Sequence, residues 1–228
     1  MSAANSFRPR LLVDIVSDPV CPWCFVGLNA FFIAKETLSE THDVVARLRP
    51  YQLNPDTPLE GADRRAYYAK KFPDPAFRDD MRAQLMAAAE DAGAPFDPMG
   101  PTHLPNTLAA HRVLRWAHFD GLHEALARRL YEAFWLENAD IGDAETLAGL
   151  AADVGMDGAQ IGADLATEKD AKAVAAEAQA FRNAGVSGVP TFIVNEKTGF
   201  SGALPPEKLS AALKDAAAHD AEAHNEAG

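Results

Sequence analysis

The sequence predicts an α/β fold in which a β-α-β unit and a β-β-α unit flank a long all-helical segment. Short apolar runs of strand length stand near both ends of the chain, and between them apolar residues recur at helical spacing. With 228 residues, of which 48% are hydrophobic and 24% charged, the chain has the size and composition of a soluble globular protein with a substantial core.

The amino-terminal unit begins with an apolar run at residues 11–17, which predicts the first strand. A helix is expected at about 24–38, where Leu28 and Phe31 share one face. A second strand is expected near 44–48. These three elements make up the β-α-β unit.

The middle of the chain, from about 60 to 184, is predicted to be helical. One helix opens with Asn106 or Thr107 as its N-cap, and Asp143 is suited to cap another. The last helix of the block is expected to stop at Gly185, because glycine favours the backbone conformation that ends a helix.

The β pattern returns after the helical block. Residues 189–194 are expected to form a strand, 195–199 a hairpin turn and 200–202 a short partner strand. A final helix follows, and no large apolar residue occurs after Leu213. The tail at 216–228 is therefore expected to be disordered.

This order of elements is that of a thioredoxin-like domain interrupted by an all-helical insertion. We assign residues 10–58 and 185–215 to the thioredoxin-like domain and 59–184 to the insertion. A pair of cysteines beside a β-α-β pattern is itself typical of thioredoxin-like redox proteins.

The two cysteines of the chain stand where the first strand turns into the first helix, as Cys21-Pro22-Trp23-Cys24. A cysteine in the first turn of a helix faces the positive end of the helix dipole, which favours its thiolate. Pro22 suits the first helical position because it has no N–H to lose. The sequence thus predicts a redox-active dithiol, with Cys21 as the exposed attacking thiol and Cys24 as the more buried resolving thiol.

Two other interpretations of the cysteine pair remain open. The pair could be half of a zinc site, but such a site needs four ligands, and none of the seven histidines lies at a familiar zinc spacing. His111 and His118 are interpreted as polar-face residues of a helix. The cysteines could also be inert core residues. We expect no bound metal.

Pro190 is expected to supply the second half of the site. Proline cannot donate to a sheet ladder, so its place at the start of an internal strand is explained by a cis Val189–Pro190 bond. In that geometry the backbone of Val189 would face the cysteines and bind an extended peptide or a thiol, with Trp23 adding apolar contact. The alternative is an ordinary trans proline in a loop.

Two acidic residues near the cysteines are candidates for supporting roles. Asp14 is expected either to be buried in the first strand and relay a proton to Cys24, or to face solvent on an edge strand. Asp18, three residues before Cys21, is a candidate cap for the first helix.

The formal net charge of −12 argues against nucleic acid or an anionic membrane as the main partner. The sequence has no apolar stretch typical of a signal peptide or a membrane span. We expect a cytoplasmic protein, although a mature exported form would look the same.

Four separated segments resemble the FrnE-type branch of the DsbA family, and the resemblance covers about residues 10–213. The segments are 18–27, 49–55, 106–112 and 185–192. The resemblance implies a thioredoxin fold with a helical insertion and dithiol–disulfide oxidoreductase activity. It implies that Cys21 and Cys24 are catalytic and that Pro190 is the cis-proline. It also implies that Asn106 borders the site.

The same superfamily contains 2-hydroxychromene-2-carboxylate isomerases and kappa-class glutathione transferases. Those enzymes typically have serine at the position of Cys21 and an acidic residue followed by arginine after the last strand, whereas residues 200–205 of this chain contain neither. The resemblance therefore favours a thiol–disulfide oxidoreductase or isomerase. A glutathione-dependent isomerase or transferase acting on small aromatic compounds is the alternative, and a non-enzymatic redox sensor is a third hypothesis.

These interpretations also define the expected partners. No bound cofactor is expected beyond the redox-active Cys21–Cys24 disulfide, and glutathione is a candidate co-substrate. The expected partner is a substrate protein with thiols or disulfides, or a small thiol. The oligomeric state is left open, with a homodimer as one option.

Overall fold

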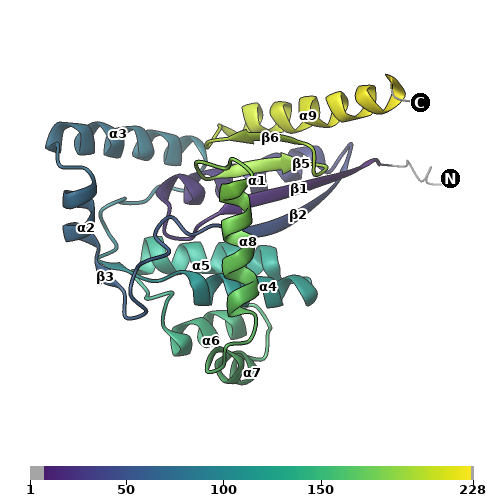
Figure 1. The fold of residues 1–228 in the computed structure, drawn as a ribbon. Helices are drawn as coiled ribbons and strands as arrows, with labels where there is room; N and C mark the ends of the chain where they lie inside the picture. Colours follow the sequence, from purple (N-terminus) through teal and green to yellow (C-terminus); the bar gives the residue numbers. More distant parts are fainter. Residues whose placement is uncertain (1–7, 227–228) are drawn as a thin grey trace.

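The chain folds into a layered α/β part and a helical block that lies beside it (Figure 1). A computed structural model describes residues 8–226. In chain order the elements are β1 (Arg10–Ser17), α1 (Pro22–Leu38), β2 (Asp43–Pro50), β3 (Ala62–Asp63), α2 (Arg64–Lys71), α3 (Pro75–Asp91), β4 (His103–Leu104), α4 (Leu108–Phe119), α5 (His123–Glu137), α6 (Ala144–Asp153), α7 (Gly158–Leu165), α8 (Ala171–Asn183), β5 (Thr191–Val194), β6 (Thr198–Ser201) and α9 (Pro206–Glu226).

The main sheet has four strands in the order β2-β1-β5-β6. β1 and β2 are parallel, and α1 supplies the crossover that a parallel pair requires. β5 runs antiparallel to β1 and forms a hairpin with β6. The β-α-β and β-β-α units thus share one sheet, which is the thioredoxin-like arrangement predicted from the sequence.

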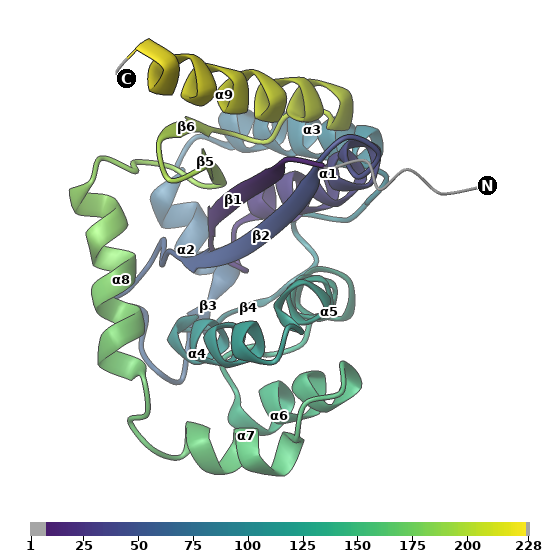
Figure 2. The same cartoon turned by 90° about the vertical axis from the view of Figure 1, so that its right-hand side faces the viewer.

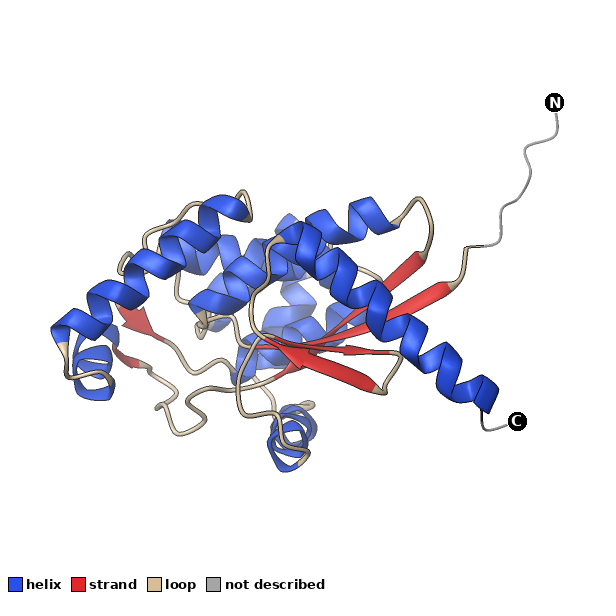
Figure 3. Ribbon diagram, turned by 90° about the horizontal axis from the view of Figure 1, so that it is seen from above, coloured by secondary structure: helices blue, strands red, loops and turns tan. Residues whose placement is uncertain are grey.

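One face of the sheet is covered by α1 and α9. Ile15 of β1 is paired with Phe192 of β5, and the ring of Phe192 stacks on Phe31 of α1 with centroids 6.1 Å apart. Leu209 and Leu213 of α9 are buried in the same core. Seen from above, α9 lies across the strands (Figure 3).

The helical block extends from the side of β2. Helices α4, α5 and α8 contact this strand, while α6 and α7 lie at the end of the molecule farthest from α9 (Figure 2). A ring nitrogen of His123 lies 2.9 Å from the carbonyl oxygen of Ala46, so α5 helps to cover the β2 edge. The apolar core continues from the sheet through α1 into the helical block. The division at residues 59–184 stays a prediction.

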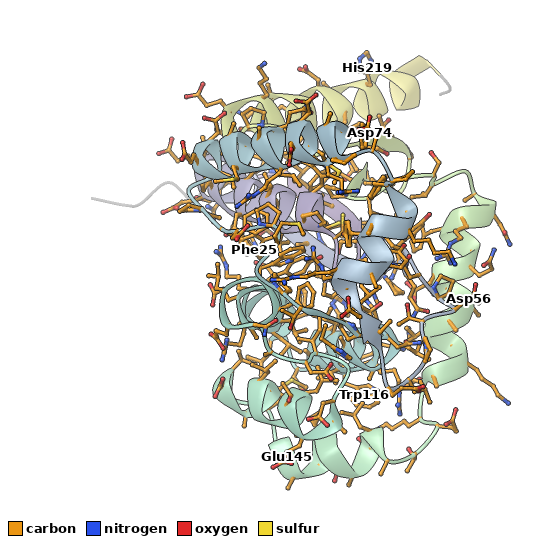
Figure 4. All side chains as sticks on the ribbon, turned by 90° about the vertical axis from the view of Figure 1, so that its left-hand side faces the viewer. Phe25, Asp56, Asp74, Trp116, Glu145 and His219 are labelled. Atoms are coloured by element: carbon orange, nitrogen blue, oxygen red, sulfur yellow. The ribbon has the colours of Figure 1, made fainter. Side chains whose placement is uncertain are left out.

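Aromatic rings join α1 to the helical block directly beneath the cysteines. Phe25 meets Phe96 edge to face at 4.9 Å, and Phe96 meets Trp135 of α5 at 5.1 Å. The indole N–H of Trp135 donates to the carbonyl oxygen of Pro19 at 3.0 Å. Figure 4 labels Phe25 and shows the layer of side chains between α1 and the helices below it. This cluster holds the turn that precedes Cys21 in a defined position.

The carboxyl-terminal helix is longer than the sequence predicts. The disordered tail expected at 216–228 is wrong for 216–226, because α9 continues to Glu226, and 227–228 lie outside the described residues. Ala216 is buried, and alanine, lysine and glutamate are strong helix formers. Between residues 8 and 226, no helix is both long and apolar enough to cross a membrane.

Candidate active site

The two cysteines lie at the amino end of α1. Cys21 is the N-cap residue, and Pro22 occupies the first turn, as the sequence predicts. The N–H of Cys21 donates to the carbonyl oxygen of Asp18 at 2.9 Å, and the N–H of Cys24 donates to that of Cys21 at 3.1 Å. Both thiols are free. No acidic residue lies in the first turn, so the helix dipole favours a thiolate there without opposition from a nearby carboxylate of that turn.

The two thiols differ in environment. Cys24 is 0% exposed, and burial raises its pKa well above the ordinary value, with the adjacent Cys21 raising it further and an N–H from Asp18 lowering it. Cys24 therefore rests as a neutral thiol. Cys21 is only 5% exposed, so the prediction that this thiol is exposed is wrong, whereas the prediction that Cys24 is the more buried of the two is confirmed.

The cover over Cys21 comes from segments that are distant in the sequence. Its sulfur lies 3.7 Å from the carbonyl oxygen of Val189. On α2, burial raises the pKa of the Tyr68 phenol, and negative charge on Cys21 would raise it further. Sequence periodicity contains no information on such a contact between a helix and a loop.

The Val189–Pro190 bond is cis, as predicted. The carbonyl of Pro190 accepts a hydrogen bond from the N–H of Gly202 at 2.8 Å. The proline ring packs on Gly27 of α1 so closely that an added Cβ at position 27 would lie 2.7 Å from its Cγ. Gly27 thus permits the close approach of α1 to the proline loop, a role that sequence reasoning missed.

Val189, Pro190 and Cys21 are brought together by the fold, and Trp23 lies in the same helical turn as the cysteines. Trp23 and Val189 are half-buried and pack against the core. Each therefore keeps part of its surface available to a ligand. Their role in substrate binding stays a prediction.

Asp18 is buried. The prediction that its side chain caps α1 is wrong, because α1 has no side-chain capping hydrogen bond. The Asp18 carboxylate accepts a hydrogen bond from the N–H of Leu53 at 2.7 Å and a longer one from Val20 at 3.5 Å. Burial raises the pKa of Asp18 from 3.8 to about 6, although these N–H groups and the Thr107 hydroxyl lower it. Asp18 is thus a carboxyl group that changes charge near neutral pH.

Asp14 is buried, as one of the two predicted alternatives has it, and the alternative of a solvent-facing residue on an edge strand is wrong. The predicted proton relay to Cys24 is not supported by its position. Asp14 lies on the central strand β1. Side chains alternate along a strand, and Ile15 faces α1, so Asp14 lies on the opposite face of the sheet from α1. There it accepts hydrogen bonds from Arg47 at 2.5 and 2.6 Å, and Arg49 lies 3.3 Å away.

Asn106 has a structural position beside the segment that follows β2. Its amide nitrogen donates to the Thr57 carbonyl at 2.7 Å, and its oxygen accepts from Gln52 at 3.3 Å and from the N–H of Leu108 at 3.0 Å. It thus supports the start of α4, where Thr107 is the N-cap residue. Within residues 8–226 no hydrogen bond joins it to either cysteine.

His111 is a site residue that sequence reasoning missed, because it was interpreted as a polar-face residue. It is only 4% exposed, and its Nε2 lies 3.0 Å from the carbonyl oxygen of Tyr51 and 3.9 Å from Oδ1 of Asp18. Burial lowers its pKa from 6.5 to about 4, so the ring is neutral at neutral pH. The buried Ala110 and Leu114 at helical spacing could have indicated that position 111 faces inward.

Tyr51 connects the two halves of the site. Its N–H donates to the Ser17 carbonyl at 3.1 Å, and its hydroxyl donates to the Val186 carbonyl at 3.2 Å, in the loop that leads to Pro190. The guanidinium of Arg182 on α8 lies 4.6 Å from the Tyr51 ring centre. The end of β1, the end of β2 and the proline loop are therefore held together by one side chain and its backbone.

The described residues 8–226 contain no group of three or more histidine, cysteine or carboxylate side chains placed to hold a metal ion. A zinc site at the cysteine pair would thus find no third ligand of these types in that part of the chain. The geometry instead presents a thiol pair, a neutral buried histidine and a carboxyl group with a raised pKa.

The chain is similar to several known proteins. A curated relative, the uncharacterized protein YwbO of Bacillus subtilis (strain 168), is 29% identical over 205 residues, covering 89% of this chain and 96% of the relative. A probable DsbA oxidoreductase from Streptomyces coelicolor has a similar structure, with a TM-score of 0.80 and 28% identity over 90% of this chain and 89% of that one.

A 2-hydroxychromene-2-carboxylate isomerase is also similar in structure, with a TM-score of 0.67 and 16% identity over 92% of this chain and 98% of that one. At that identity the likeness shows a shared fold only. The family model of the DSBA-like thioredoxin domain matches residues 12–214, which include both cysteines and Pro190. The chain therefore belongs to the DSBA-like thioredoxin domain family.

Proposed function

We propose that this protein is a thiol–disulfide oxidoreductase in which Cys21 attacks and Cys24 resolves. The observation that carries the proposal is the placement of the Cys21 sulfur at the amino end of α1 and 3.7 Å from the Val189 carbonyl, beside the cis Val189–Pro190 bond. Backbone groups next to the thiol could bind the chain of a substrate in extended form.

The reaction is written for the dithiol form. The thiolate of Cys21 attacks one sulfur of a substrate disulfide and expels the other sulfur as a thiolate. Cys24 then attacks Cys21 in the mixed disulfide, which forms the Cys21–Cys24 disulfide and releases the second substrate thiolate. The two electrons lost by the enzyme dithiol reduce the substrate disulfide. The reverse sequence oxidises two substrate thiols.

Cys24 must lose its proton as it attacks, and Asp18 is suited to accept it. A backbone N–H of Asp18 lowers the pKa of Cys24, and the charge of the Asp18 carboxylate raises it, so the two groups interact electrostatically. With a pKa of about 6, Asp18 is mostly ionised at neutral pH yet basic enough to take a proton. The supporting role predicted for Asp18 therefore becomes that of a proton acceptor.

The low exposure of Cys21 bears on the substrate. Cys21 is only 5% exposed, which leaves a narrow approach to its sulfur. Slender substrates fit this site better, either a small disulfide such as oxidised glutathione or an unfolded segment. We propose glutathione as a co-substrate that restores the starting redox state.

The test uses two matched variants. Cys24→Ser, incubated with oxidised glutathione, is expected to accumulate a mixed disulfide on Cys21 that mass spectrometry detects, while Cys21→Ser is expected to form none and to lose insulin and glutathione-disulfide reduction. Wild-type reduction by Cys21→Ser would overturn the proposal. Glutathione-dependent isomerase turnover retained in that variant would support the alternative function instead.

A further inference from the structure

The segment 51–53, directly after β2, positions Asp18 and is itself held by two helices. The N–H of Leu53 donates to the Asp18 carboxylate at 2.7 Å. Two residues earlier, the Tyr51 carbonyl lies 3.0 Å from Nε2 of His111 on α4. Between them, the Gln52 carbonyl accepts a hydrogen bond from Arg182 on α8.

The tautomer of His111 follows from this contact. A carbonyl oxygen can only accept, so Nε2 of the neutral ring carries the proton and donates it to Tyr51. The same N–H edge lies 3.9 Å from Oδ1 of Asp18. The N–H of the neutral His111 ring therefore faces the Asp18 carboxylate without placing a full positive charge beside it. By its hydrogen bond to Tyr51, His111 also holds the segment that supplies the Leu53 amide.

The groups that face Asp18 come from every element packed around it. They are Cys24 on α1, Thr107 and His111 at the start of α4, Tyr131 on α5 and, at longer range, Arg182 on α8. Arg182 is the cation of this set: its charge lowers the pKa of Asp18, and its guanidinium also donates to the Gln52 carbonyl of segment 51–53. The N–H of Leu53 donates to the carboxylate at 2.7 Å, closer than the N–H of Val20 at 3.5 Å, so a change in segment 51–53 acts on Asp18 directly.

His111 also lines a cavity of about 180 Å³, together with Arg47, Arg115 and His118. Deleting the ring would enlarge this cavity. A useful variant must therefore fill the space of the ring, which leucine and glutamine do and alanine does not.

Within the exchange reaction proposed above, on which this inference rests, we propose that His111 is a positioning residue for Asp18. Its N–H holds the Tyr51 carbonyl, and this contact keeps the Leu53 amide on the carboxylate that receives the proton of Cys24. Removing the donor loosens segment 51–53 and weakens a hydrogen bond to the charged form of Asp18, which makes the carboxylate a stronger base.

The experiment measures the pH dependence with which Cys24 displaces glutathione from a preformed mixed disulfide on Cys21. His111→Leu, which lacks the donor, is expected to move the inflection assigned to Asp18 upward by about one pH unit, a tenfold change in proton affinity. His111→Gln keeps an N–H donor of similar size and is expected to retain the wild-type inflection. His111→Met is the substitute if the leucine variant does not fold.

A second measurement does not depend on activity. The carboxyl-carbon NMR signal of Asp18, assigned by its loss in Asp18→Asn, is expected to titrate about one unit higher in His111→Leu than in the wild type. An unchanged titration in a folded leucine or methionine variant would overturn the inference, and so would an equal shift in His111→Gln. A wild-type protein without exchange activity but with this NMR difference would refute the proposed function alone.

Discussion

Replacing Asp18 by asparagine should make the stability of the fold depend on pH, whereas the stability of the wild type is expected to be nearly independent of pH between 4 and 6.5. Burial raises the pKa of Asp18 from 3.8 to about 6. Its contribution to stability is therefore fully present below pH 3.8 and is lost as the pH rises through about 6. The neighbouring His111 has its pKa lowered from 6.5 to about 4. Its contribution is present above pH 6.5 and is lost as the pH falls through about 4.

The two effects have similar size and opposite sign. Each pKa differs by about two between the folded and unfolded chain, which corresponds to about 3 kcal/mol for each group. Over pH 4 to 6.5 the loss from one group is offset by the gain from the other, so together they leave the wild-type stability nearly flat.

Asp18→Asn removes one side of this balance, since asparagine does not titrate. Urea unfolding of the variant at a series of pH values should show a loss of about 3 kcal/mol, relative to the wild type, as the pH falls from 6.5 to 4. His111→Gln is the mirror variant and should lose a similar amount as the pH rises over that range. Parallel stability curves for the wild type and Asp18→Asn would refute this reasoning.

Three further outcomes are expected. Gly27→Ala should destabilise the fold by about 2 kcal/mol in urea unfolding and slow thiol exchange, because the added Cβ would lie 2.7 Å from the Pro190 ring. The control is Gly149→Ala, whose methyl meets no atom within 4 Å and which should be neutral or stabilising in the same measurement. Asp14→Asn should lower the free energy of unfolding by about 2 kcal/mol and leave the pH profile of thiol exchange unchanged. If Asp14 were a proton relay, the profile would change. Asp143→Ala should cost about 1 kcal/mol in thermal unfolding, because the Asp143 side chain caps α6 by accepting the N–H of Thr146.

Local signals in the sequence predicted most of the fold. The apolar runs located β1, β2 and β5, helical spacing located α1, and capping residues located the starts of α4 and α6 to within a few residues. The helix-ending glycine was also predicted, since Gly185 follows Ala184, the C-cap residue of α8, and has a φ of 95°. These signals are local because strands, helices and caps depend on residues only a few positions apart.

The supporting residues of the site were harder to predict. The position of Asp14 could be predicted only from the register of β1 against β2, which places Arg47 beside it. The burial of His111 could be predicted only from the packing of α4 against the segment after β2, which turns this polar side chain inward. The full length of α9 depends on its contacts with α1, which cannot be predicted from a composition of small residues.

The sequence by itself determined the chemistry of the centre: a thiol pair at the start of a helix, and a proline placed to face it from far along the chain. Only the tertiary structure decided which groups surround that pair. It buried Cys21 beneath Val189, moved Asp14 to the other face of the sheet, and joined Asp18 to His111 across 93 positions of sequence. The physical reason is that burial and pairing change the charge of a side chain, and both arise from contacts between segments that the sequence keeps apart.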